Sequence, residues 1–134
     1  MLCVEYLGVQ DIIVCGHQGC GGCKAANSPT DHGLLEHWLR NIRDVIFANI
    51  EEIRSIKDAE AQHQKIVELN VRGQCMNLLR NPIVQQRQMA TGLYPRVHGF
   101  VYDIRNGLID IDFHAEAAKN HPIYGVECAP HKEA

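Results

Sequence analysis

A short apolar run that leads directly into a glycine-rich loop is the feature that most restricts the possible folds of this chain. The run Ile12–Cys15 is continuous rather than alternating, which favours a strand covered on both faces, as in a parallel sheet. Gly16 ends the run, and three further glycines before residue 23 allow a tight turn. A short helix is expected at Cys23–Ala26. The sequence therefore predicts the order strand, glycine-rich loop, helix.

Later segments carry regular patterns of apolar residues. Helical spacing predicts amphipathic helices over Leu34–Ile53 and Glu60–Leu79, and Pro82–Met89 can form a third helix with proline at its first position. Alternation over Val97–Ile104 and Leu108–Phe113, separated by an Asn-Gly turn, predicts a β-hairpin. These elements together predict an α/β domain, with a short, mostly parallel sheet flanked by helices and a C-terminal β-hairpin.

The chain has no repeat or linker, so residues 1–134 are expected to form a single domain. Met1–Leu7 has the pattern of the last turns of a helix but no N-cap residue, which indicates a domain that is incomplete at its N-terminus. After His114 the residues become small and polar. We therefore expect residues 115–134 to form a flexible tail.

Charge and cysteine usage exclude several classes of protein. The chain has 13 basic and 16 acidic residues and no long run of either sign, so nucleic acid is not an expected partner. No apolar stretch approaches the ~20 residues that span a bilayer, and no basic segment of a signal peptide follows Met1. The six cysteines are unevenly spaced, unlike those of a small secreted domain. We expect a cytoplasmic protein that does not interact with membranes.

His17 and Cys20 lie three residues apart in the glycine-rich loop. Imidazole nitrogen and thiolate sulfur are ligands that zinc prefers, and the positive end of the following helix favours the thiolate of Cys20. The N–H groups of Gly21 and Gly22 can face an anion at the same place. Because short H-x-x-C sequences also arise by chance, the spacing alone is only moderately specific for a metal site.

Neighbouring cysteines leave a second interpretation open. Cys23 forms a C-x-x-C pair with Cys20, so Cys15, His17, Cys20 and Cys23 provide four potential ligands of a thiol- or metal-handling module. The simpler interpretation is that Cys15 and Cys23 are small core residues.

Other notable residues have structural interpretations. Cys3 and Cys75 follow helical stripes and are expected to pack in the core. Trp38 is expected in the core or at a subunit contact. Arg72 lies in a helix that otherwise faces the core, and a buried ion pair is its expected role. His63 and the other scattered histidines are expected at the surface or in helix caps.

The segment Ile12–Ala26 resembles the second zinc motif of the β-class carbonic anhydrases, a strand followed by G-H-x-x-C-G-G and a short helix. Glu68–Arg72, Asn81–Val84 and His98–Ile109 resemble later helices and the C-terminal hairpin of that family, in the same order. The resemblance covers nearly the whole chain up to about Phe113.

The resemblance implies a zinc lyase that reversibly hydrates carbon dioxide to bicarbonate and a proton. His17 and Cys20 match two of the family's three constant zinc ligands, and Gly21 matches the position whose backbone N–H contacts substrate or product. In that family a zinc-bound water of lowered pKa attacks carbon dioxide. Because the family's subunits form dimers or larger assemblies, a homo-oligomer, dimer or tetramer, is expected.

One family motif does not occur in these residues. The motif C-x-D-x-R on an upstream strand supplies a further cysteine ligand and an Asp/Arg pair that orients the solvent on the metal, so catalytic residues of that kind cannot be assigned here. The same region contributes a central strand, and the strand at Ile12–Cys15 is therefore expected to have an unpaired edge. A catalytically silent role in interaction or subunit assembly is the alternative hypothesis.

Overall fold

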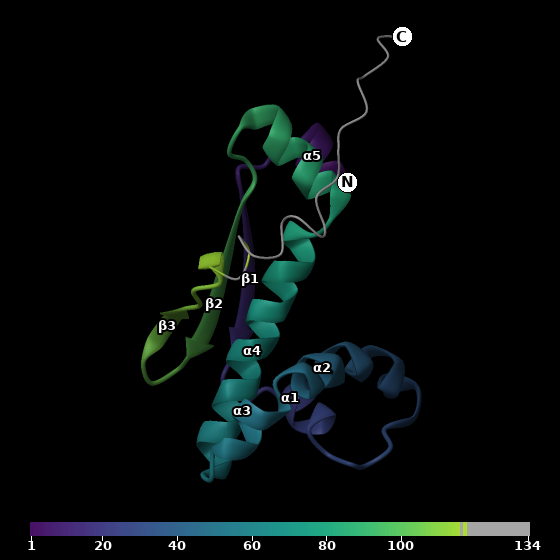
Figure 1. Ribbon diagram of the computed structural model, residues 1–134, viewed down its shortest axis with the longest axis vertical. Coiled ribbons are helices and arrows are strands. Elements are labelled where there is room, and N and C mark those ends of the chain that lie inside the picture. The colour runs from purple at the N-terminus through teal and green to yellow at the C-terminus, as the bar shows by residue number, and fades with distance from the viewer. Residues whose placement is uncertain (116, 118–134) are drawn as a thin grey trace.

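The computed structural model describes residues 1–115 and 117. Its order of helices and strands confirms the α/β class, a small mixed sheet flanked by helices and ended by a hairpin (Figure 1). The predicted flexible tail lies outside the described residues except for Ala115 and Ala117. The elements are the π-helix η1 (Leu2–Tyr6), β1 (Asp11–His17), α1 (Gly21–Ala26), the 3-10 helix η2 (Gly33–Leu35), α2 (Glu36–Ala48), α3 (Ile50–Ser55), α4 (Ala59–Leu79), α5 (Pro82–Thr91), β2 (Arg96–Asp103) and β3 (Gly107–Asp110).

The three described strands form one sheet in the order β1-β2-β3. β1 and β2 are parallel, with Asp11 opposite Arg96 and His17 opposite Tyr102. The helices from α1 to α5 make the crossover that a parallel pair requires. β2 and β3 are antiparallel and form the predicted hairpin. Both strands of the parallel pair therefore point the same way, and β1 ends where the glycine-rich loop begins.

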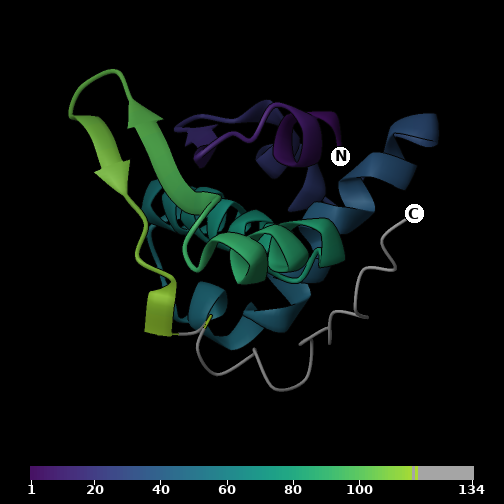
Figure 2. The same cartoon turned by 90° about the horizontal axis from the view of Figure 1, so that it is seen from above.

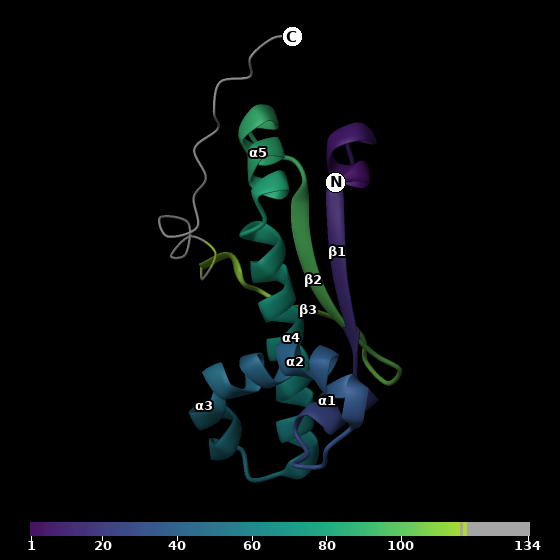
Figure 3. The same cartoon turned by 90° about the vertical axis from the view of Figure 1, so that its right-hand side faces the viewer.

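The core lies between the sheet and α4, which runs along one face of β1 and β2 (Figures 2 and 3). Two glycines allow this close approach. A Cβ atom on Gly16 would lie 2.6 Å from Val71 Cγ2, and one on Gly99 would lie 2.9 Å from Cys75 Sγ. The largest fully buried side chains include Leu39, Ile53, Ile66, Val67, Val71 and Val101.

The described residues cover one face of β1 and leave the other exposed, so the prediction of a strand buried on both faces is wrong. Its residues alternate between exposed and half-buried, and Ile13 is 62% exposed. Cys15 lies on the exposed face, which also corrects its predicted place in the core. The apolar run is continuous, but the described residues supply a helix layer on one side alone. β1 is also the edge of the described sheet, which confirms the expected unpaired edge.

The helix predicted over Leu34–Ile53 is broken into η2, α2 and α3. Asn49 ends α2 with non-helical backbone angles, and its side-chain amide donates to the carbonyl of Val45 at 2.8 Å. An asparagine side chain competes with helical hydrogen bonding in this way. The apolar stripe continues across the break because Ile53 packs in the same core.

The predictions for α4 and α5 are confirmed to within two residues. Asp58 caps α4 by accepting a hydrogen bond from Ala61 N at 2.8 Å, and Asn81 caps α5 by accepting one from Ile83 N at 3.0 Å. Pro82 occupies the start of α5. Within the described part of the chain, every helix is too short or too polar to cross a membrane.

Some predictions about single residues are confirmed by the structure, and others are wrong. Cys75 is fully buried as predicted, whereas Cys3 is exposed. Trp38 is 56% exposed and therefore lies outside the core, so a subunit contact stays the prediction for this residue. Within residues 1–115 and 117, no carboxylate forms an ion pair with Arg72, and its Nε atom is buried without a hydrogen-bond partner. The predicted ion pair of Arg72 is therefore wrong. Four carboxylates line the same two cavities as Arg72, but none of them forms an ion pair with it: Asp44, Glu68, Asp110 and Asp112.

A charged cluster joins the first residues of β1 and β2. Arg96 donates to both carboxylate oxygens of Asp11, at 2.8 and 3.0 Å, and His98 Nε2 lies 2.7 Å from Asp11 Oδ1. These hydrogen bonds, that from Arg96 first, lower the pKa of Asp11 to about 2. The Arg96 guanidinium also lies over the ring of Tyr94.

Replacing Asp11 with asparagine is expected to make the stability of the fold depend less on pH in acid solution. A carboxyl whose pKa is lowered in the folded state stabilises the fold above its ordinary pKa, and this contribution is lost as the pH falls towards the lowered value. Melting temperatures measured between about pH 2 and pH 5 should thus fall less for Asp11→Asn than for the parent chain. Because the pair is exposed, the difference will be small. Asp110→Asn on β3 is the matched control, and equal slopes for the parent and Asp11→Asn would contradict the prediction.

Candidate metal site

The two predicted ligands lie on one turn, at the end of β1. β1 ends at His17 and α1 begins at Gly21, with Cys20 as its N-cap residue. Gly19 adopts a φ of +72°, which an L side chain rarely tolerates. The backbone N–H of Gln18 donates to the carbonyl of Tyr102 on β2 at 2.8 Å. The turn is therefore anchored to the sheet immediately after its first ligand.

The imidazole of His17 is oriented by its own turn. His17 Nδ1 lies 3.1 Å from the carbonyl oxygen of Gln18. A carbonyl can only accept, so Nδ1 carries the proton and Nε2 carries the lone pair in the neutral ring. Metal-binding histidines usually donate their other ring N–H to a carbonyl or a carboxylate. His17 therefore has the tautomer that a zinc ion requires at Nε2.

Cys20 and Cys23 differ in exposure. Cys20 is half-buried, whereas Cys23 is 1% exposed and packs in the core, as the simpler interpretation predicts. Burial is the main cause that raises the pKa of Cys23 to about 12, and a hydrogen bond with the Cys20 thiol adds to it. A thiol that resists ionisation is a poor metal ligand. Of the two cysteines, Cys20 is thus the better zinc ligand.

The described residues supply two ligands of a zinc site rather than a full set. Within residues 1–115 and 117, no group of three or more His, Cys, Asp or Glu side chains is arranged to hold a metal ion. The structure therefore does not bring Cys15, His17, Cys20 and Cys23 together as a four-ligand site. A nitrogen and a sulfur donor on one turn fit zinc in chemistry, but zinc takes three or four protein ligands.

Contacts with α2 hold the helix that follows the turn. Arg43 donates to the carbonyls of Ala26 and Ser28, at 2.7 and 2.9 Å, and to the carboxylate of Glu36. The hydrogen bonds from Arg43 are the main cause that lowers the pKa of Glu36. Arg43 therefore satisfies carbonyls at the end of α1 and ties them to α2. Sequence reasoning missed this residue, because its partners lie up to 17 positions away.

Gly22 provides the second contact between α1 and α2. A Cβ atom at Gly22 would lie 3.1 and 3.2 Å from ring carbons of Trp38, and 3.8 Å from Cys20 Sγ. Trp38 therefore lies against the backbone beside the proposed sulfur ligand. Packing against Trp38 therefore favours glycine at this position, independently of the shape of the turn.

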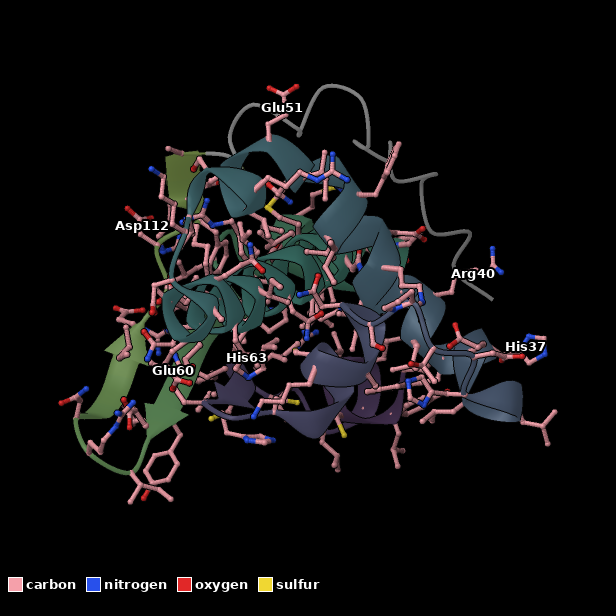
Figure 4. The ribbon with its side chains drawn as sticks, turned by 90° about the horizontal axis from the view of Figure 1, so that it is seen from below. His37, Arg40, Glu51, Glu60, His63 and Asp112 are labelled. Carbon is pink, nitrogen blue, oxygen red and sulfur yellow. The ribbon has the colours of Figure 1, made fainter. Side chains whose placement is uncertain are left out.

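His63 is a buried histidine beside the turn, so its predicted surface or capping role is wrong. It lies on α4, close to the start of that helix (Figure 4). Its Nε2 atom is buried without a hydrogen-bond partner among the described residues. Burial is the main cause that lowers the pKa of His63, and the charges of Lys24 and His17 act in the same direction. No local pattern marks this position, because only the packing of α4 against the end of β1 brings it to the site.

Comparison with known proteins gives consistent matches. A family model described as "Carbonic anhydrase" matches residues 2–109. A carbonic anhydrase of Emericella nidulans is 41% identical over 126 residues, which cover 92% of this chain and 55% of the relative. The chain spans about half the length of most of the curated relatives it matches, with shares such as 55%, 50% and 48%.

Solved structures show the same fold. A β-carbonic anhydrase of Aspergillus fumigatus matches with a TM-score of 0.80 and 26% identity, and the match covers 94% of this chain and 61% of the other. A structure report on two tetrameric β-carbonic anhydrases of Sordaria macrospora matches with a TM-score of 0.75 and 31% identity, over 82% of this chain and 56% of the other.

Proposed function

Because the chain belongs to the β-class of the carbonic anhydrase family, we propose that it acts in the zinc-dependent, reversible hydration of carbon dioxide to bicarbonate and a proton. The observation that carries the proposal is the turn between β1 and α1. It holds an imidazole and a thiol three residues apart, with the imidazole's Nδ1 already bonded to Gln18 O.

In this proposal His17 Nε2 and Cys20 Sγ bind the zinc ion. When bound, zinc supplies a water of lowered pKa as a nucleophile at neutral pH. The backbone N–H of Gly21, the first residue of α1, donates to substrate or product. The carbonyl of Gln18 fixes the ring of His17, and the contact between Gly22 and Trp38 holds α1 behind the sulfur ligand. The proposal requires a further ligand besides His17 and Cys20.

Exposed apolar residues of the sheet favour the second candidate, a role in subunit assembly. Ile13, Tyr102 and Leu108 are 62%, 48% and 62% exposed, and Tyr102 lies directly opposite Leu108. Ile13 lies opposite His98, and the pair formed by Cys15 and Phe100 lies between it and Tyr102 on the sheet. Contiguous exposed apolar surface is typical of protein contacts. We propose a homo-oligomer, dimer or tetramer, in line with the tetrameric relatives named above. The cytoplasmic location expected from the sequence stays a prediction.

Zinc analysis and stopped-flow measurement of carbon dioxide hydration test the first role on the reduced chain. We expect one zinc ion per chain, together with hydration above the rate of a zinc-free sample. Zinc without hydration, or neither, would reject an enzymatic role of this chain by itself. Light scattering of the same sample then decides the second role, because a monomer would contradict assembly.

A further inference from the structure

The C-x-x-C pair has a geometry that the proposed reaction does not use. Cys20 and Cys23 flank the first turn of α1, which is closed by a hydrogen bond from Lys24 N to Cys20 O at 3.1 Å. Residues three apart are neighbours on a helical turn. After burial, the charge and side-chain hydrogen bonding of Cys20 are the causes that raise the pKa of the Cys23 thiol. The backbone therefore brings the two thiols to neighbouring positions on one helical turn, in a spacing that thiol–disulfide oxidoreductases also use.

We propose that Cys20 and Cys23 form an intramolecular disulfide when the chain is oxidised, and that this disulfide excludes zinc from His17 and Cys20. The first half of the inference concerns the two thiols alone. The second half rests on the proposed function, since it takes Cys20 as a zinc ligand.

Exposure decides where oxidation begins. Cys20 is half-buried and can be reached from solvent, whereas Cys23 is 1% exposed. A small disulfide such as oxidised glutathione therefore reacts first with Cys20. The Cys20 thiolate attacks one glutathione sulfur, the glutathione S–S bond breaks, and one glutathione leaves as a thiolate.

The second step closes the protein disulfide. The sulfur of Cys23 attacks the Cys20 sulfur of the mixed disulfide, and the second glutathione leaves and takes the proton of Cys23, so this buried thiol need not ionise first. In total, two protein thiols lose two protons and two electrons, and one oxidised glutathione becomes two reduced molecules. Cys23 lies beside Cys20, so this step needs no large movement of the chain.

The other described cysteines have different surroundings. Cys75 is fully buried and its thiol lies 3.8 Å from the carbonyl of His98, while Cys3 and Cys15 are exposed.

A sulfur atom in a disulfide is no longer a thiolate and therefore no longer a zinc ligand. Zinc binding and the disulfide should thus exclude each other at Cys20.

Trp38 offers an optical signal for the same event. It is the single tryptophan of the chain, and its ring packs against Gly22, between the two cysteines. A change in the redox state of the pair should alter its fluorescence, because the sulfur environment of the ring changes.

Peptide mass analysis of the metal-free full chain tests the disulfide. In a Cys3→Ser/Cys15→Ser background, the tryptic peptide 1–24 retains only Cys20 and Cys23. After incubation with oxidised glutathione, we expect this peptide to be lighter by two hydrogen atoms and to resist alkylation. Cys23→Ala in the same background should instead retain a stable glutathione adduct at Cys20. An adduct at Cys20 with an alkylatable Cys23 in the parent background would overturn the inference.

Zinc content separates the two halves of the inference. The reduced protein should take up zinc, the oxidised protein should not, and dithiothreitol should restore uptake. Cys23→Ala that has been treated with oxidised glutathione and then briefly reduced carries no adduct at Cys20. It should bind zinc as the reduced parent does. Equal zinc uptake by reduced and oxidised parent would overturn the exclusion of zinc. If the reduced protein takes up no zinc, the proposed function fails, and the peptide masses still decide the disulfide.

Discussion

Replacing either proposed ligand is expected to abolish zinc binding by this chain. His17→Ala removes the ring whose Nδ1 is bonded to Gln18 O, and Cys20→Ser replaces a soft thiolate with a hydroxyl. Removing a group that hydrogen-bonds to a metal ligand typically lowers metal affinity by about 10–100-fold. Loss of the ligand itself should therefore lower it by more than about 100-fold. Competition with a coloured zinc chelator measures the affinity. His17 is exposed, and Cys20→Ser replaces a single atom of a half-buried side chain that packs against the core.

Two variants control for general effects on the turn. Cys15→Ser changes an exposed cysteine two residues before His17, and His37→Ala removes an exposed histidine from α2. Both should bind zinc as the parent does, with unchanged helix content by circular dichroism. Zinc affinity of Cys20→Ser equal to that of the parent would show that the metal, if bound, is held elsewhere.

Gly16→Ala is expected to destabilise the fold by about 1–3 kcal/mol, the usual cost of overpacking. The new Cβ would lie 2.6 Å from Val71 Cγ2, which is too close for any real contact. Val71 is fully buried on α4, and a β-branched side chain in a helix has essentially one rotamer. The helix and the strand must therefore move apart, and His17 moves with the strand. Urea denaturation measures the change in the free energy of unfolding.

A double variant tests the cause of this loss. Val71→Ala by itself removes buried methyl groups, but in Gly16→Ala/Val71→Ala the smaller side chain gives room to the new Cβ. The double variant should thus be more stable than the sum of the two single changes predicts. Gly21→Ala is the matched glycine control, because its Cβ would meet no atom within 4 Å. Additive effects of Gly16→Ala and Val71→Ala would contradict the steric explanation.

The fold was predictable wherever local chemistry decides it. Asp58 and Asn81 cap the helices they precede, Pro82 begins α5, and the Asn-Gly turn forms the hairpin. The failures have two causes, a second layer that the sequence does not show and one local side-chain bond. The run Ile12–Cys15 indicates a strand, but the sequence does not show that α4 covers one face and no helix covers the other in the described residues. The local cause is Asn49, whose side chain bonds to the carbonyl of Val45 where the apolar periodicity continues and α2 ends.

The site was predictable where its residues are close in sequence. His17 and Cys20 fall within one turn, so a motif identifies them. Arg43 and His63 reach the same region from α2 and α4, and no spacing relates them to His17. Arg72 shows the opposite error, because its charge in a core-facing helix suggested an ion pair where the structure leaves its Nε without a partner.

The open edge of β1 also affects how the chain behaves at high concentration. Its outward backbone N–H and C=O groups have no strand partner among the described residues, and Ile13 beside them is exposed. Such an edge is a template to which another extended segment can add by main-chain hydrogen bonds. Crowding of chains therefore favours strand-to-strand aggregation, and β1 contains no lysine or proline that would oppose such pairing.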